Sequence, residues 1–307
     1  MSTPQAAELV WDCACLLGEG PVWNAADASI YFVDIKGAAV LAYTPRTGAK
    51  RRWPMPDWIG WLHPWRDGRW VAGLRRGVYL LTLEPTVRLE PLCLVHPPGS
   101  PMRLNDGKID PRGRLWFGSM HDSDPDSLEG RLYRLHDSGS AVTALAVDLG
   151  YRIANGPAFS ADGRALWHTD SAARTIYAFD LDAEGTPTNK RVWARFGGAA
   201  HVEGFPDGMA CDAGGDLWIA RWGAGFVSVH RRDGTELRRL SLPATQVSSL
   251  TFGGEQLEDL YVTTARIGLA PEALQDQPQA GGLFRLRGCG RGLAPQNWLG
   301  SPALAPP

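Results

Sequence analysis

In four short stretches of the chain an acidic or amide side chain is followed, at once or one residue later, by a glycine and then by a run of strand-forming residues. These stretches are GEGPVW with Glu19, RLNDGK with Asn105, NGPAF with Asn155 and PDGMA with Asp207. If the chain is built from repeats, this recurring motif makes the four positions equivalent. In the second stretch, Asp106 could occupy the equivalent position in place of Asn105. Equivalent positions in a closed ring of repeats converge near its axis. The sequence therefore predicts one cluster of oxygen-bearing side chains at such an axis.

Three of these residues form a set of hard oxygen donors. Glu19 and Asp207 are carboxylates, and Asn155 supplies an amide carbonyl. Such donors suit Ca²⁺, Mg²⁺ or Mn²⁺ and tolerate Zn²⁺ or Fe²⁺. Three protein ligands would leave coordination positions for water and a substrate, whereas clustered carboxylates without a cation would repel each other and take up protons. Each dipeptide alone could be an ordinary turn, but together they lead us to expect one divalent metal ion.

The elements that must position this cluster follow from a second repeated phrase: a Gly/Asp turn, an aromatic or β-branched strand, a polar break and another strand. The phrase occurs six times, and the aromatic residues of its first strand are Tyr31, Trp70, Trp116, Trp167, Trp218 and Tyr261. Their separations of 39, 46, 51, 51 and 43 residues average 46, a period typical of propeller blades. We predict an all-β fold, a six-bladed β-propeller whose repeated aromatic residues fill the space between blades. A pair of β-sandwiches would not account for the spacing.

Composition restricts the domain organisation, partners and location. We expect one domain over residues 1–307, with the C-terminal tail from about 294–307 extended. The formal net charge of −2 comes without a basic block, which argues against a nucleic-acid partner. No stretch approaches the roughly 18 apolar residues that cross a bilayer, and the N-terminus lacks signal-peptide features. The five cysteines contain no CxxC pair, so we expect reduced thiols in a cytoplasmic protein.

Other catalytic motifs are missing from the sequence. It contains no G-x-S-x-G elbow, which leaves a serine hydrolase unsupported. It also has no P-loop, and no GxGxxG in a strand–helix context. These absences agree with chemistry that needs only a metal ion and water.

Five segments carry a resemblance to a known family: GEGPVW (18–23), RLNDGKIDPRGRLWFGSM (103–120), NGPAFSADG (155–163), PDGMACDAGGDLWIA (206–220) and AGGLFRL (280–286). In this order they resemble the SMP-30/gluconolactonase/regucalcin-like family over nearly the whole chain. The resemblance implies a six-bladed propeller with one divalent metal in its channel, which hydrolyses sugar-acid lactones. The expected partner is a small sugar lactone, and we expect a monomer or weak homo-oligomer that binds neither nucleic acid nor membrane.

The resemblance also implies roles for individual residues. Glu19, Asn155 and Asp207 match the metal ligands, and Asp207 matches the aspartate that acts as general base. Arg103 and Asn105 match substrate-binding positions, and their side chains share one strand face. The implied reaction is metal-dependent hydrolysis of an aldonolactone, such as a glucono- or pentonolactone, to the aldonic acid.

One segment departs from the family pattern and leaves the sugar open. Several relatives have a substrate-contacting glutamate within a Met-Ala-Glu-Glu stretch, where this chain has Met120-His121-Asp122-Ser123. The connection over residues 122–130 is this chain's own, and His121 is our candidate for a replacement substrate contact. Alternatives are a phosphotriesterase-like or other lactone hydrolase on the same fold, or a non-catalytic metal-binding propeller. For the Trp-rich loop (Trp58, Trp61 and Trp65), we expect core packing, with a pocket wall as the alternative.

Overall fold

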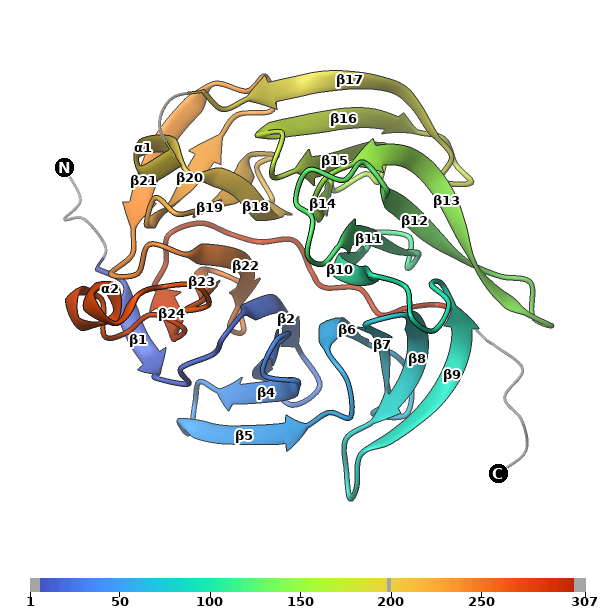
Figure 1. The fold of residues 1–307 in the computed structure, drawn as a ribbon, viewed down its shortest axis with the longest axis horizontal. Helices are drawn as coiled ribbons and strands as arrows, with labels where there is room; N and C mark the ends of the chain where they lie inside the picture. Colours follow the sequence, from blue (N-terminus) through green and yellow to red (C-terminus); the bar gives the residue numbers. More distant parts are fainter. Residues whose placement is uncertain (1–5, 198–199, 301–307) are drawn as a thin grey trace.

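The repeated phrase folds into six antiparallel sheets of four strands, arranged as blades around a central axis (Figure 1). The structure is a computed structural model that describes residues 6–197 and 200–300. The predicted all-β fold and its six blades are confirmed. In five of the blades the chain runs from an inner strand near the axis to an outer strand at the rim, whereas the sixth takes its outer strand from the N-terminal segment. The innermost strands bring the candidate site residues together.

The first three blades follow one another along the chain. Blade 1 consists of β2 (Gly18–Asn24), β3 (Ser29–Asp34), β4 (Ala39–Thr44) and β5 (Ala49–Pro54). Blade 2 consists of β6 (Ile59–Pro64), β7 (Trp70–Leu74), β8 (Gly77–Thr82) and β9 (Arg88–Leu94). Blade 3 consists of β10 (Met102–Ile109), β11 (Leu115–His121), β12 (Gly130–Asp137) and β13 (Val142–Tyr151).

The remaining blades complete the ring. Blade 4 consists of β14 (Ala154–Phe159), β15 (Ala165–Asp170), β16 (Thr175–Leu181) and β17 (Pro187–Arg195). Blade 5 consists of β18 (Phe205–Cys211), β19 (Leu217–Trp222), β20 (Phe226–His230) and β21 (Glu236–Ser241), and the short helix α1 (Ala200–Glu203) precedes it. Blade 6 consists of β22 (Val247–Gly253), β23 (Asp259–Thr264), β24 (Leu283–Leu286) and the N-terminal strand β1 (Glu8–Trp11), with helix α2 (Pro271–Asp276) between β23 and β24.

Closure of the ring depends on β1, which pairs antiparallel with β24 (Figure 1). Glu8 lies opposite Arg285 in this pairing, and the two side chains form an ion pair at 2.9 Å. The first strand of the chain thus becomes the outer strand of the last blade. This arrangement joins the two ends of the repeat array, so that the inner strands surround a closed channel.

The six repeated aromatic residues all lie in the second strand of their blades and are buried. Several contact the neighbouring blade: the rings of Tyr31 and Trp70 are 4.3 Å apart, and those of Trp218 and Phe252 are 5.1 Å apart. The indole of Trp218 also donates a hydrogen bond of 2.9 Å to Asp212, which caps the preceding turn. The predicted packing between blades is confirmed at these contacts.

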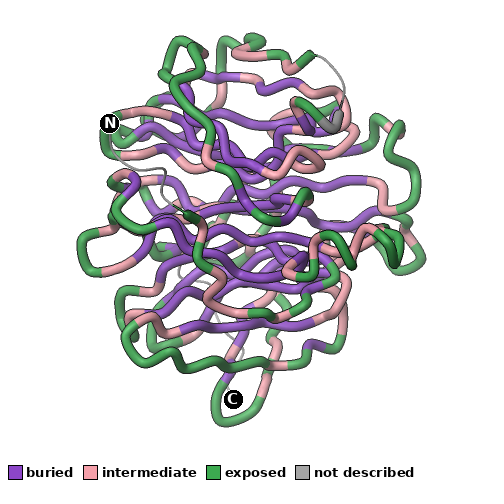
Figure 2. Tube along the Cα trace, turned by 90° about the vertical axis from the view of Figure 1, so that its left-hand side faces the viewer, coloured by how far each residue is buried: buried purple, intermediate pink, exposed green. Residues whose placement is uncertain are grey.

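Burial decreases from the axis to the rim. All six residues of the inner strands β6 and β14 are buried, whereas the outer strands β5 and β21 are almost entirely exposed. Figure 2 shows the same gradient, with buried segments through the middle of the ring and exposed segments in the connections. The core therefore lies between blades and around the axis.

The C-terminal segment crosses the ring, and residues 293–300 have no regular secondary structure (Figure 1). Leu293 and Ala294 share a cavity with Val22 and Phe159 at the end of the channel opposite the candidate site. We call residues 290–300 the C-terminal strap. Its Trp298 packs against Trp65 with ring centroids 5.9 Å apart, and the Trp65 indole donates a hydrogen bond to the Gly300 carbonyl. The rest of the expected tail, residues 301–307, lies outside the described residues. The five cysteine thiols are free, and no described helix is long and apolar enough to cross a membrane.

Candidate active site

The inner strands of four blades share an irregularity at the motif residues. The pairing with the second strand shifts register just after Glu19, across Asn105, just after Asn155 and across Asp207. Such bulges turn side chains away from the regular alternation of a strand. In two of these motifs the glycine permits the turn, because Gly20 and Gly156 have φ values of +53° and +42°, a region that favours glycine. Gly107 and Gly208 are required for a different reason, since a Cβ at Gly107 would lie 2.9 Å from the Trp61 ring and one at Gly208 would lie closer still to the Ser249 hydroxyl oxygen.

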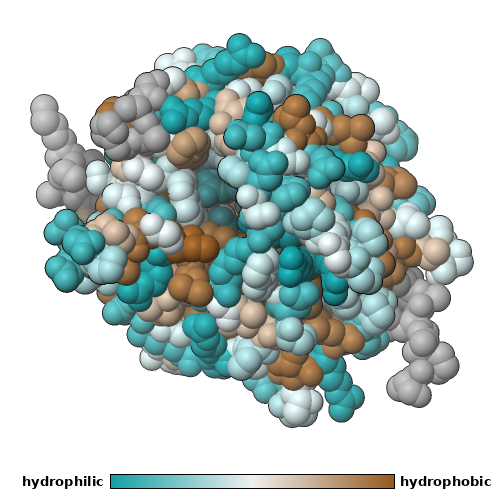
Figure 3. All heavy atoms as spheres, viewed as in Figure 1, coloured by the Kyte–Doolittle hydropathy of each residue, from teal (hydrophilic) through white to brown (hydrophobic). Residues whose placement is uncertain are grey.

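The bulged strands surround a cavity of about 380 Å³ at one end of the channel. Five predicted site residues line it together: Glu19, Arg103, Asn105, Asn155 and Asp207. Its apolar wall includes Leu17, Met120, Ile153, Phe205, Trp222 and Ile267. The centre of the ring is recessed between polar and apolar side chains in Figure 3. A concave, largely buried site with a few converging polar groups is typical of a small-molecule pocket.

The carboxylates in this cavity strongly perturb one another. Burial and repulsion from Asp106 raise the pKa of Glu19 to about 8, although the Gly20 N–H opposes the shift. Burial, followed by repulsion from Glu19 and Asp106, raises the pKa of Asp207 well above its usual value. Their proximity therefore creates an unfavourable concentration of negative charge. A bound cation would relieve it and return both groups to the ionised state.

The donor set fits a hard divalent cation. Asn155 lies against Asp207, to which its amide donates a hydrogen bond, and its Oδ1 accepts one of 3.0 Å from the Gly156 N–H. Among the described residues, no three His, Cys, Asp or Glu side chains form a metal-binding group. The predicted set contains only two carboxylates, so the third donor would be the amide oxygen of Asn155. Carboxylate and amide oxygens are ligands that Ca²⁺ accepts, and carboxylates also suit Mg²⁺ and Mn²⁺.

Asp106 connects blades beneath the cavity. Its carboxylate accepts hydrogen bonds of 2.7 Å from the Gly107 N–H and 3.0 Å from the Gly156 N–H. It thereby ties the bulge of β10 to the bulge of β14. Nearby, the half-buried Lys108 donates a hydrogen bond of 2.7 Å to the Met209 carbonyl in blade 5. Burial lowers the pKa of this lysine, whereas attraction by Asp106 and Glu19 opposes the shift.

A polar network covers one side of the cavity. Arg103 donates hydrogen bonds of 2.6 Å to Asn105 and 2.8 Å to Asp122, and Lys36 also donates to Asp122, at 2.6 Å. Asn105 uses its amide N–H to bind the Ala154 carbonyl at 3.0 Å. Sequence reasoning missed Lys36, whose β3–β4 turn carries no special pattern, and did not assign a role to Asp122. The departure from the family pattern at residues 120–123 was the only available signal for Asp122.

The structure does not bring His121 into this cavity. The strand alternation of β11 directs the adjacent Met120 and Asp122 to the lining. The His121 ring instead accepts a backbone hydrogen bond of 2.9 Å from Asp124 and a longer one from Ser123. It thus orders the start of the connection that follows β11.

The Trp-rich loop divides into different environments. Trp61 is fully buried and packs 5.5 Å from Phe117, so it is a core residue. Trp65 is also buried, against the C-terminal strap. Trp58 is only partly buried and lies under the ammonium of Lys36, 3.4 Å from its ring centroid. Core packing is therefore confirmed for Trp61 and Trp65, whereas Trp58 contacts a side chain that lines the cavity.

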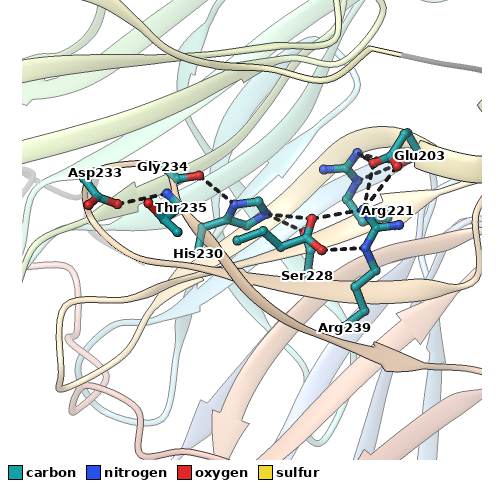
Figure 4. Close-up of polar contacts among 9 residues, drawn as sticks. Glu203, Arg221, Ser228, His230, Asp233, Gly234, Thr235 and Arg239 are labelled. Carbon is teal, nitrogen blue, oxygen red and sulfur yellow. Dashed lines mark hydrogen bonds and ion pairs between the residues drawn. The ribbon is translucent and has the colours of Figure 1, made fainter.

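An ion-pair network holds the turn that precedes Asp207 (Figure 4). The fully buried Arg221 donates a hydrogen bond of 2.8 Å to the Glu203 carbonyl, and Arg239 binds the Glu203 carboxylate at 3.0 Å. Gly204 follows with a φ of +64°, and β18 then begins at Phe205, which lines the cavity. Glu203 therefore anchors the entry to β18 from outside the cavity.

Comparisons with known proteins agree with this fold. Residues 17–266 match the SMP-30/Gluconolactonase/LRE-like region. The chain is 38% identical to Pentonolactonase XacC of Haloferax volcanii, over 90% of this chain and 92% of the relative. It is 34% identical to regucalcin of Oryctolagus cuniculus, over 93% and 96% of the two chains. A crystal structure of the calcium-binding protein regucalcin from Agrobacterium tumefaciens superposes with a TM-score of 0.89, at 26% identity, over 97% of this chain and 99% of that one.

Proposed function

Because this chain belongs to the SMP-30/gluconolactonase/LRE-like family, we propose that it is a metal-dependent lactonase that hydrolyses an aldonolactone, such as a glucono- or pentonolactone, to the aldonic acid. One observation carries the proposal: two mutually repelling carboxylates, an amide and a guanidinium line the same cavity. The lactone-hydrolysing activity named for the Haloferax volcanii relative supports the substrate class, and the calcium-binding regucalcin structure supports a divalent cation.

The proposed roles follow from the chemistry of the side chains. Glu19, Asn155 and Asp207 would hold the cation, which supplies Lewis-acid stabilisation of the charge that develops on the lactone carbonyl oxygen. Asp207 would also accept a proton from the attacking water. The attack would form a bond from the water oxygen to the carbonyl carbon. Collapse of the tetrahedral adduct would then break the ring C–O bond, and the departing ring oxygen would take up a proton that balances the one removed from water, which leaves a hydroxy acid. Arg103 and Asn105 would hold the sugar hydroxyls in the orientation that this attack requires.

The apolar wall supports the same reaction. Phe205, Trp222 and Ile153 line the cavity beside the carboxylates, so they restrict the amount of water around the reacting groups. Electrostatic interactions are stronger where bulk water is excluded. The wall also offers flat apolar surfaces to the C–H faces of a sugar ring.

The test is lactone hydrolysis by chelator-stripped protein, followed with a pH indicator after Ca²⁺, Mg²⁺, Mn²⁺, Zn²⁺ or Fe²⁺ is restored. Gluconolactone and xylonolactone are the substrates, and spontaneous hydrolysis is subtracted. We expect turnover that depends on the metal and that Asp207→Asn reduces at least about 100-fold, a typical contribution of general-base catalysis. The matched control is Asp276→Asn on the exposed helix α2, which should retain full activity. Folded wild-type protein without turnover under any metal would refute the proposal.

A further inference from the structure

Four side chains from three blades gather at the mouth of the cavity, and we call them the mouth cluster: Lys36, Trp58, Arg75 and Asp122. Lys36 lies in the turn between β3 and β4, Trp58 directly precedes β6, Arg75 follows β7, and Asp122 follows β11. The Lys36 ammonium is 3.4 Å and the Arg75 guanidinium carbon 4.5 Å from the centroid of the Trp58 ring. Cations in such positions are attracted to the aromatic face.

Positive charge exceeds negative charge in this region. Asp122 is the carboxylate that both Lys36 and Arg103 bind, at 2.6 and 2.8 Å, and Arg75 adds a third cation. Burial lowers the pKa of Lys36, its hydrogen bond to Asp122 opposes that shift, and repulsion from Arg103 and Arg75 lowers the pKa further. Glu19, although it lines the same cavity, belongs to the carboxylates that a metal ion would neutralise.

The cluster also has unused hydrogen-bonding capacity. An ammonium has three N–H donors, and within residues 6–197 and 200–300 Lys36 donates one hydrogen bond, to Asp122. The buried Nε of Arg75 has no hydrogen-bond partner within the described part of the chain. Lys36, Arg103 and Asp122 line the cavity, so two of the three cations and the one carboxylate that they share face the space that a substrate would occupy.

We propose that the mouth cluster is an anion subsite, and that the lactone substrate carries a carboxylate, sulfonate or phosphate group on the part of its carbon skeleton remote from the lactone carbonyl. This inference rests on the proposed lactonase function and specifies its substrate class. The Lys36 ammonium binds the anion directly, the Trp58 ring holds that ammonium in place, and Arg75 adds long-range attraction. Asp122 keeps Lys36 and Arg103 apart and orients both.

A neutral sugar would bind the mouth cluster less favourably than an anionic one. Its hydroxyls would gain hydrogen bonds from Lys36 but would leave the surplus positive charge uncompensated in a partly buried site. An anionic group would satisfy the N–H donors and balance the charge at once, and such charge-assisted hydrogen bonds are roughly twice as strong as neutral ones. The charge excess therefore selects an anionic substituent.

The test compares kcat/KM for metal-loaded protein on neutral gluconolactone with kcat/KM on two anionic lactones, 6-phosphogluconolactone and glucarolactone, which distinguish phosphate from carboxylate. We expect the wild type to favour at least one anionic lactone over gluconolactone by tenfold or more. Lys36→Met keeps the aliphatic stem beside Trp58 but removes the charge. It should reduce that selectivity ratio at least tenfold, mainly through KM.

Two controls separate a subsite from a merely structural contact. Lys36→Arg should retain most of the anionic preference, and Lys50→Met, at an exposed position on β5, should leave the ratio unchanged. A wild type that prefers the neutral lactone would overturn the inference, as would a Lys36→Met protein that loses activity on all lactones equally. If folded wild-type protein hydrolyses no lactone with any metal, the proposed function itself fails and this inference falls with it.

Discussion

The glycine between Asn155 and the rest of β14 gives the sharpest test of how the fold positions the site. Gly156 has a φ of +42°, and a Cβ added there would lie 2.5 Å from the Asp207 carbonyl oxygen. Gly156→Ala therefore adds left-handed backbone strain of about 1–2 kcal/mol to overpacking of about 1–3 kcal/mol. We expect the free energy of unfolding in urea to fall by about 2–5 kcal/mol.

For Gly156→Ala we expect the rate of lactone hydrolysis to fall by more than the loss of folding stability alone would cause. Ordinary van der Waals contact begins at 3.4 Å, so β14 and β18 must separate by roughly 1 Å, and a displacement of that size costs about 100-fold in rate. The matched control is Gly139→Ala, which has a φ of +79° and no heavy atom within 4 Å of the added Cβ. Its free energy of unfolding should fall only by the backbone strain of about 1–2 kcal/mol, and its rate of lactone hydrolysis should be unchanged.

The assays are urea unfolding and metal-restored lactone hydrolysis on both variants. Equal destabilisation of the two proteins would show that the close approach to Asp207 has no energetic consequence. Full activity of Gly156→Ala would show that the bulge does not set the position of the site residues.

Three further predictions concern the candidate metal ligands, the turn before Asp207 and the C-terminal strap. Glu19→Gln should weaken metal affinity at least tenfold, measured by titration of the stripped protein, and unchanged affinity would remove Glu19 from the ligand set. Arg221→Met should lower the free energy of unfolding in urea by about 3 kcal/mol, because it breaks a buried charged contact. The control Arg239→Met, at a more exposed position, should lower it by about 1 kcal/mol or less. Equal losses of stability in the two variants would contradict this account of the turn before Asp207. Trp298→Ala in the C-terminal strap should cost about 3 kcal/mol and spare lactone hydrolysis at the opposite end of the ring, while Leu299→Ala, at a 72% exposed position, should change the free energy of unfolding by less than about 0.5 kcal/mol.

Local chemistry explains why the blade pattern could be predicted from the chain alone. Strand-forming aromatics recur after Gly/Asp turns, and those turns are stabilised by neighbours in the sequence. Asp110, for example, accepts backbone hydrogen bonds from Arg112 and Arg114 and one from the Trp116 indole. Because each blade repeats the same sequence pattern of turn and aromatic strand, the spacing of the aromatic residues predicted six blades.

The candidate metal cluster was predictable for a related reason. Glu19, Asn155 and Asp207 occupy the same phase of the repeat, and a closed ring brings one phase of every repeat to its axis. The glycine beside each residue was visible in the sequence. The strand pairing alone revealed that these glycines accompany a register shift, and that the pairing of the first and second strands is interrupted in all six blades.

Contacts between different blades were decided by tertiary structure. Lys36 meets Asp122 across 86 residues of chain, and Glu8 meets Arg285 across 277. His121 shows the same limit at shorter range, because the path of the chain after β11 directs its ring to the backbone of Ser123 and Asp124, while Asp122 lines the cavity. The sequence by itself determined the strands, their turns and the phase of the oxygen donors, since these depend on neighbours along the chain. The closure of the ring, the side chains at the mouth and the charge they present were decided by the packing of blade against blade, which no local pattern encodes.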